Sequence, residues 1–177
     1  MKIILISGKA QHGKDTSANI MKQELERRGE KVLVAHYADL VKYVCRTFFD
    51  WDGVKDEYGR YILQYVGTDI VRARKPNFWV DFLSEILSIF SDEWDFAIIP
   101  DTRFPNEIDA MRQSFPDVTH VRVRRTDFSS PLTEEQQQHP SETALDDTEP
   151  DFWLENNGTI EDLEEQIALF VREEFYE

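Results

Sequence analysis

The residues best suited to chemistry are Gly8, Gly13 and Lys14, which follow a short apolar run at residues 3–6. Four residues separate the two glycines, and a polar segment typical of a helix start comes after the lysine. Glycine lets the backbone curl so that consecutive N–H groups point inward, and the next helix directs its positive end at an anion. Lys14 would then reach the outer phosphates. The pattern predicts a nucleotide-binding loop made of Gly8, Lys9, Ala10, Gln11, His12, Gly13, Lys14, Asp15 and Thr16.

One position departs from the usual pattern of such loops. A Ser or Thr normally follows the lysine and ligates Mg²⁺, but this chain has Asp15 there and Thr16 one place later. A carboxylate can hold Mg²⁺ directly or through water, because the ion prefers oxygen ligands and keeps several waters. Asp15 and Thr16 are therefore candidate metal ligands. Asp15 also suits a helix N-terminus, where negative charge is stabilising.

A second set of polar side chains is spaced for one face of a helix. Arg60, Gln64 and Thr68 lie four residues apart, and Arg72 follows one turn later. Gly67 interrupts the apolar spacing at a point where a ligand can approach the backbone closely. This face either contacts an anionic substrate or lies in solvent.

Strands that alternate with helices must position these side chains. The apolar patterns predict strands at about residues 2–7, 32–35, 96–99, 118–123 and 152–155, and helices at about 14–28, 38–50, 57–74, from Pro76, from 105 and from Thr159. Such alternation predicts a parallel sheet covered by helices on both faces. Ligands of such sheets bind at the carboxyl ends of the strands. Asp101, Arg103 and Glu107, which follow one strand, should therefore lie near the glycine loop.

Residues 125–150 show no periodicity and are rich in Thr, Ser, Pro, Glu and Gln. A long structureless stretch in a compact domain is uncommon and is often a lid over an active site. Arg125 opens this stretch and is a catalytic candidate, because it can swing onto phosphates as a lid closes. His139 and Glu142 either latch the lid or belong to a solvated loop.

Composition narrows the class of protein. The chain has 177 residues, of which 41% are hydrophobic, and this suits one domain, 1–177, with a substantial core. A net charge of −15 argues against nucleic-acid binding, because the phosphate backbone would be repelled. Cys45 is the only cysteine, as expected in a reducing cytosol. We find no room for a secretory signal and no apolar stretch of membrane-spanning length, so we expect a cytoplasmic protein.

Three classes of phosphate-loop protein compete. A GTPase switch would need an Asn-Lys-x-Asp motif, which the chain lacks. A motor-type ATPase usually ends its third strand with an acidic pair, whereas here Pro-Asp-Thr-Arg follows that strand. A small-molecule kinase needs a second anion site, cations around the transferred phosphoryl group and a lid that excludes water. The chain offers all three.

A series of motifs runs in order through nearly the whole chain. The most specific are Gly13-Lys14-Asp15-Thr16 and Pro100-Asp101-Thr102-Arg103. The others are Ala38-Asp39-Leu40-x-Lys42, Arg60 with Leu63-Gln64 and Gly67-Thr68-Asp69, Phe78-Trp79-Val80, Glu107, His139-x-Ser141-Glu142 and Asn156-Asn157-Gly158-Thr159. In these motifs the chain resembles the bacteriophage deoxynucleoside monophosphate kinases, a branch of the nucleoside monophosphate kinase group. The aspartate after the loop lysine is the form found in that family.

The resemblance implies a P-loop kinase three-layer α/β sandwich with a central parallel sheet of about five strands. A helical substrate-binding region would span about 38–92, with the lid at about 125–150. The implied reaction transfers the γ-phosphoryl group of ATP to a deoxynucleoside monophosphate, with Mg²⁺, in the host cytoplasm if the protein is phage-encoded.

The resemblance also implies roles for individual residues. Lys14 and Arg103 would be catalytic, and Asp101 would be a further metal candidate. Asn157, Gly158 and Thr159 would lie near the adenine of ATP. The acceptor nucleotide would contact Asp39, Lys42, Arg60, Gln64, Gly67, Thr68, Arg72, Trp79, Asp101, Arg103 and Glu107. Asp39 suits a helix N-cap at least as well, and Lys42 meets either phosphate or solvent.

Two other functions stay open at this point. One is a different small-molecule P-loop kinase, such as a dephospho-coenzyme A kinase, and the other is a non-catalytic nucleotide-binding module. The lid segment and the second cationic helix speak against the module. Phenylalanine-rich helices suit either a homodimer interface or a core.

Overall fold

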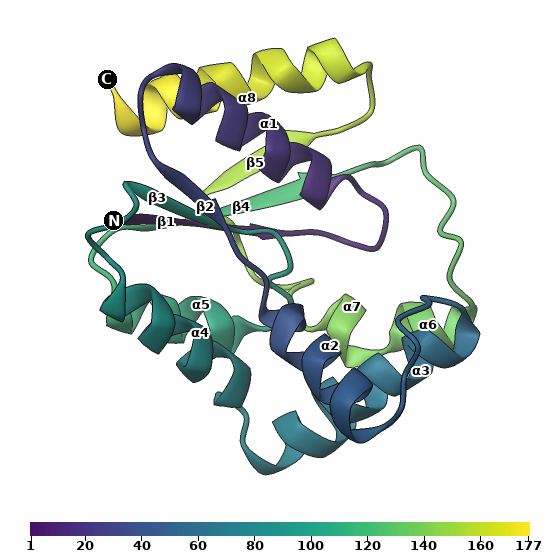
Figure 1. The fold of residues 1–177 in the computed structure, drawn as a ribbon. Coiled ribbons are helices and arrows are strands. Elements are labelled where there is room, and N and C mark those ends of the chain that lie inside the picture. The colour runs from purple at the N-terminus through teal and green to yellow at the C-terminus, as the bar shows by residue number, and fades with distance from the viewer.

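The computed structural model describes all residues, 1–177, and has a five-stranded sheet at its centre (Figure 1). The strands are β1 (Lys2–Ser7), β2 (Val32–Val34), β3 (Phe96–Ile99), β4 (Val118–Arg124) and β5 (Phe152–Glu155). Their order is β2-β3-β1-β4-β5, and every neighbouring pair is parallel. The predicted parallel sheet is confirmed, with the strand that leads into the glycine loop in the middle.

Helices lie on both sides of the sheet. They are α1 (Lys14–Arg27), α2 (Tyr37–Phe48), α3 (Glu57–Gln64), the π-helix η1 (Tyr65–Arg72), α4 (Phe78–Ile89), α5 (Pro105–Ser114), α6 (Glu134–Gln138), α7 (Pro140–Thr143) and α8 (Ile160–Phe175). Helices α1 and α8 lie together on one side, and the remaining helices lie on the other (Figure 1). The predicted three-layer α/β fold is confirmed. None of these helices is both long enough and apolar enough to cross a bilayer.

The central strand supplies both hydrophobic cores. Ile3 and Leu5 belong to one buried cluster, and Ile4 and Ile6 belong to the other. Successive side chains of a strand point to opposite faces, so a continuous apolar run is what a strand covered on both faces requires.

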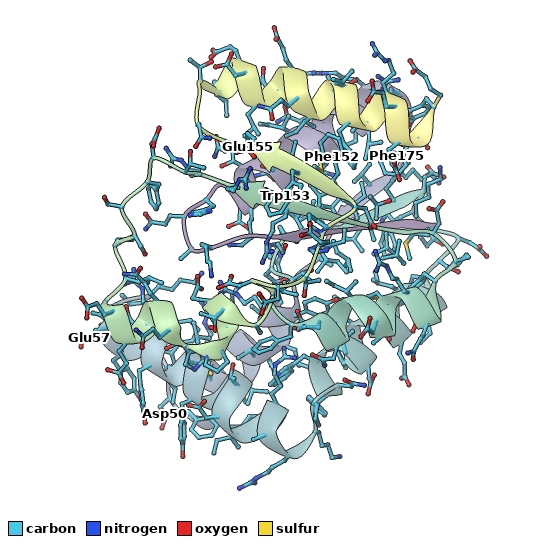
Figure 2. The ribbon with its side chains drawn as sticks, turned by 180° about the vertical axis from the view of Figure 1, so that it is seen from behind. Asp50, Glu57, Phe152, Trp153, Glu155 and Phe175 are labelled. Carbon is cyan, nitrogen blue, oxygen red and sulfur yellow. The ribbon has the colours of Figure 1, made fainter.

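The last helix closes the second of these cores. Phe152 of β5 packs against Phe170, with ring centroids 4.7 Å apart, and Figure 2 shows Phe152 and Phe175 on the side of the sheet that α8 covers. The predicted start of this helix is confirmed, because the Thr159 side chain accepts a hydrogen bond in the first turn. The apolar spacing of this helix predicts that Ile160 is buried, and this prediction is wrong. Ile160 lies in the first turn of α8 and is exposed.

Two predicted segments differ from the structure. The helix expected over 57–74 changes type, from α3 to the wider η1. The segment 125–150, expected to lack regular structure, contains the short helices α6 and α7. Neither α6 nor α7 has an apolar periodicity long enough to signal a helix.

Several phenylalanines of α2 and α4 are exposed rather than part of either core. They are Phe48, Phe78 and Phe82, and Phe90 follows at the end of α4. The homodimer that the sequence left open stays a prediction.

Gly59 allows α3 to pack against the preceding loop. Trp51 is buried and donates from Nε1 to the Val54 carbonyl at 3.0 Å. A Cβ on Gly59 would overlap that carbonyl and come within 2.9 Å of the indole nitrogen. We expect Gly59→Ala to lower the free energy of unfolding by about 1–3 kcal/mol, measured by chemical denaturation. Arg60→Ala is the control, since its exposed side chain should change stability by less than about 0.5 kcal/mol. Equal stability of both variants would contradict this packing.

Candidate active site

A cavity of about 680 Å³ lies where the carboxyl ends of the strands meet. The loop after β1, the start of α2, the segment after β3, α3, η1 and the lid all contribute to its lining. Of the residues named from the sequence, the cavity is lined by Ala10, Gln11, Lys14, Asp15, Lys42, Arg60, Gln64, Gly67, Thr68, Arg72, Trp79, Asp101, Arg103 and Glu107. The structure therefore brings the glycine loop and the predicted acceptor-binding face to one cavity.

The glycine loop is curled and held from two neighbouring strands. Gly8 and Gly13 have φ values of 147° and 102°, which favour glycine. A Cβ would overlap the Val123 carbonyl at Gly8 and the Asn156 side-chain amide at Gly13. That amide donates to the His12 carbonyl at 2.9 Å. The loop thus needs glycine at both positions, and the end of β5 holds its shape.

Lys14 begins α1 and is nearly buried, with 9% of its surface exposed. Its Nζ donates to the carbonyls of Gly8 at 2.8 Å and Lys9 at 2.9 Å. Burial, and after it the nearby Arg103 guanidinium, lower the pKa of Lys14 to about 8. The ammonium therefore lies where further negative charge would stabilise it.

The polar face predicted on residues 57–74 lines the cavity even though the helix changes type. Arg60 and Gln64 come from α3, whereas Gly67, Thr68 and Arg72 come from η1. A π-helix places more residues in each turn than an α-helix. The prediction of one continuous α-helix, made from the spacing of four residues, is therefore wrong. All five residues nevertheless line the same cavity.

Glu107 anchors Arg72 at the wall of the cavity. Its carboxylate is buried and accepts from the Arg72 guanidinium at 2.6 Å. It also accepts from the backbone N–H groups of Arg103 at 2.7 Å and Phe104 at 3.0 Å. Burial raises the pKa of Glu107, and the Arg72 charge opposes this rise. Glu107 therefore holds the Arg72 side chain and the turn before α5 in place.

Two buried aromatic residues complete this wall. Trp79, predicted from the sequence, donates from Nε1 to the Gly67 carbonyl at 2.9 Å. Tyr37, which sequence analysis missed, is 5% exposed, and its hydroxyl has no hydrogen-bond partner. A buried polar group of this kind is normally paired. The Tyr37 hydroxyl is therefore able to bond a ligand without first losing a bond.

Asp101 and Asp15 have different surroundings. The Asp101 carboxylate accepts from the backbone N–H groups of Tyr37 at 3.1 Å and Ala38 at 2.8 Å, and its burial raises its pKa. Asp15 is 80% exposed and lies 3.5 Å from His36. This pairing lowers the pKa of Asp15 and raises that of His36. Asp101 thus holds the start of α2, whereas Asp15 faces the open cavity.

Other residues predicted from the sequence do not line the cavity: Gly8, Lys9, His12, Gly13, Thr16, Asp39, Arg125, Asn157, Gly158 and Thr159. The interpretation of Asp39 as a helix N-cap is wrong, because His36 occupies that position. Asp39 pairs instead with Lys42 at 2.8 Å. Arg125 lies over the ring of Phe128, 4.7 Å from its centroid.

Lys55 is a cavity residue that sequence analysis missed. It lies in the loop before α3, and no local pattern distinguishes it from other surface lysines. Lys42, Arg72 and Arg103 each pair with a carboxylate. The side chains of Lys55 and Arg60 make no ion pair or hydrogen bond. These two cations can bind an anion without breaking an existing interaction.

The sheet order, the glycine loop and the cavity define a protein with the P-loop kinase fold. A sugar kinase from Janibacter sp. HTCC2649 aligns with a TM-score of 0.59 at 17% identity, over 99% of this chain and 96% of that one. The Mycobacterium tuberculosis APS kinase in complex with AMPPNP and APS aligns with a TM-score of 0.56 at 13% identity, over 97% of each chain. At such identities the likeness concerns the fold.

Residues 52–167 match the family model of the deoxynucleotide monophosphate kinases. The deoxynucleotide monophosphate kinase of Enterobacteria phage T4 is 32% identical over 119 residues, which are 66% of this chain and 46% of the phage protein. The chain therefore belongs to the deoxynucleotide monophosphate kinase family, and it spans about half the length of this curated relative. The family resemblance inferred from the motifs is confirmed.

Proposed function

We propose that the chain transfers the γ-phosphoryl group of ATP to a deoxynucleoside 5′-monophosphate, producing ADP and a deoxynucleoside diphosphate. One observation carries this proposal: a single cavity joins a nucleotide-binding loop to a second cationic face, in a chain of this family. Two nucleotides bound at these two places would meet with their phosphates facing each other. Direct transfer then needs mainly positioning and charge stabilisation.

Lys14 and Arg103 are the proposed catalytic residues. Both line the cavity, Lys14 from the glycine loop and Arg103 from the segment after β3. Their charges would stabilise the negative charge of the transferred group. Arg125 stays a catalytic candidate of the lid, and it would have to leave Phe128 to reach the phosphates.

The acceptor would bind along α3 and η1. Arg60 and Lys55 would hold its phosphate, because they are the cavity cations whose side chains have no partner. Gln64 and Thr68 would add hydrogen bonds to the same group. Trp79 would pack near the base or sugar.

The adenine of ATP would lie near residues 157–159, outside the cavity. The side chain of Asn157 accepts from the Thr126 N–H at 2.8 Å, which ties the end of β5 to the start of the lid. The preceding residue, Asn156, donates to the His12 carbonyl of the glycine loop, so the junction adjoins this loop. If the loop holds the phosphates of ATP, the adenine would lie at this junction.

Of the three Mg²⁺ ligands proposed from the sequence, one is suitably placed to bind the ion. Asp15 presents an exposed carboxylate to the cavity beside Lys14, whereas Thr16 does not line it and Asp101 is engaged by two N–H groups. Mg²⁺ needs only one or two carboxylates when phosphates and water supply its other ligands. The chain has no cluster of three or more His, Cys, Asp or Glu side chains that could hold the ion alone. When bound, the ion would neutralise phosphate charge.

Arg60→Ala should separate the two substrates. We expect KM for the monophosphate to rise about tenfold or more, because a charged hydrogen bond to its phosphate is lost, while KM for ATP changes by less than about twofold. Arg74→Ala is the control, since Arg74 is exposed and does not line the cavity. Equal increases in both constants would place Arg60 outside the acceptor site.

An ADP-release assay across the common nucleoside monophosphates tests the proposed function. We expect ADP to appear only when a deoxynucleoside monophosphate and ATP are both present. Dephospho-coenzyme A serves as the competing acceptor. Turnover with it alone would replace the proposal with another small-molecule kinase, and ATP binding without turnover of any acceptor would indicate a binding module.

A further inference from the structure

Glu142, in the lid helix α7, places its carboxylate against the glycine loop. One oxygen accepts a hydrogen bond from the Ala10 N–H at 2.9 Å, and the other pairs with the Arg103 guanidinium. The side chain is only 6% exposed. It also lies close enough to Lys14 to raise the pKa of that ammonium, against the lowering by burial. The carboxylate thus lies among one loop N–H and two cations.

Further contacts hold the lid in this position. Lys9 of the loop donates from Nζ to the Glu142 carbonyl at 2.6 Å and pairs with the Asp146 carboxylate. On the other side, His139 lies 3.7 Å from Asp69 of η1. The lid therefore contacts both the glycine loop and the acceptor-binding helix, with Glu142 between them.

The groups that bind Glu142 are those that a terminal phosphate would need. Backbone N–H groups of such loops hold phosphates, and the loop lysine reaches the outer ones. Two anions cannot share these donors, because like charges a few ångströms apart repel strongly where water is largely excluded. A triphosphate can enter fully only if the carboxylate leaves.

We infer that Glu142 occupies the place of the terminal phosphate of ATP in the nucleotide-free protein and must be displaced when ATP binds. This inference rests on the proposed function only in that the loop binds ATP. Glu142 then couples the lid to the terminal phosphate, because ADP lacks the group that competes with the carboxylate. The apparent affinity for ATP is the intrinsic affinity multiplied by the fraction of molecules in which the site is open.

The test is the affinity of Glu142→Gln for AMPPNP and for ADP, measured by isothermal titration calorimetry with Mg²⁺. We expect the Kd for AMPPNP to fall about tenfold and that for ADP to fall by less than about threefold, because removing the charge frees the outer phosphate site. Asp147→Asn is the matched control. Asp147 is an exposed lid carboxylate with no ion pair or hydrogen bond, so its replacement should leave both constants unchanged.

Unchanged or weaker AMPPNP binding by a folded Glu142→Gln would overturn the inference, as would equal tightening in Asp147→Asn. If Glu142→Gln does not fold, amide hydrogen exchange of the wild-type chain with and without AMPPNP tests the inference instead. AMPPNP should then speed exchange of the backbone amides of residues 141–144, and unchanged or slower exchange would overturn the inference. Both measurements follow nucleotide binding rather than turnover. A protein that shows this displacement but phosphorylates no monophosphate would refute the proposed function alone.

Discussion

Replacing Lys14 with methionine is expected to lower turnover at saturating substrates by about 10³-fold or more. The Lys14 ammonium is nearly buried in the glycine loop, and its pKa of about 8 leaves it charged at neutral pH. Methionine keeps much of the side-chain volume and removes the charge that would stabilise the transferred phosphoryl group. The ADP-release assay measures the loss directly.

The fold of this variant must be shown to persist. Far-UV circular dichroism and thermal unfolding should match the wild type, because the two carbonyls that Lys14 contacts lie in a loop whose shape Asn156 also supports. Lys31→Met is the control, since the Lys31 side chain is exposed and has no partner. A folded Lys14→Met with normal turnover would contradict the assignment of the loop.

The central sheet could be predicted because its signals are local. The apolar run at residues 3–6 is long enough for a strand covered on both faces, and the glycines directly after it indicate a tight loop before a helix. The strand at 96–99 carries the same kind of signal and the strand at 152–155 a weaker one, and the structure has both with those bounds.

The prediction of the helical region was wrong where contacts between residues distant in the sequence are involved. Residues 57–74 have an amphipathic pattern that only Gly67 interrupts, but the Trp79 indole donates a hydrogen bond to the Gly67 carbonyl from another helix. No local signal reports that bond or the change to a π-helix. In the lid, α6 begins with a capping box at Thr133, yet its five residues are all polar and show no apolar face.

The residues of the candidate site likewise fall into those that the sequence identified and those that it did not. Motifs at the ends of strands identified Lys14 and Arg103, because parallel topology brings those ends together. Lys55 and Tyr37 belong to no such motif, although both line the cavity, Tyr37 from the start of α2 and Lys55 from the loop before α3. Glu142 was noticed as part of a motif, but its contact with Ala10 joins residues 132 positions apart.

Arg103→Ala should produce the second large loss of activity. The guanidinium lies where the lid meets the glycine loop, bonded to the Ser141 carbonyl at 2.9 Å and to the Glu142 carboxylate. When ATP takes the place of that carboxylate, the guanidinium would face the transferred phosphoryl group. We expect kcat to fall about 10³-fold, the magnitude seen when an arginine that stabilises phosphoryl transfer is removed.

Comparing the change in kcat with the changes in KM tests whether Arg103 acts mainly in the transition state. An arginine that acts mainly in the transition state should change the KM of either substrate by less than about threefold. Arg103→Lys should recover only a small part of the activity, because an ammonium lacks the planar fork that matches phosphate oxygens. Arg74→Ala, outside the cavity, should retain full activity. An unchanged kcat with a raised KM would instead make Arg103 a substrate-binding residue, and the search for the catalytic arginine would move to Arg125.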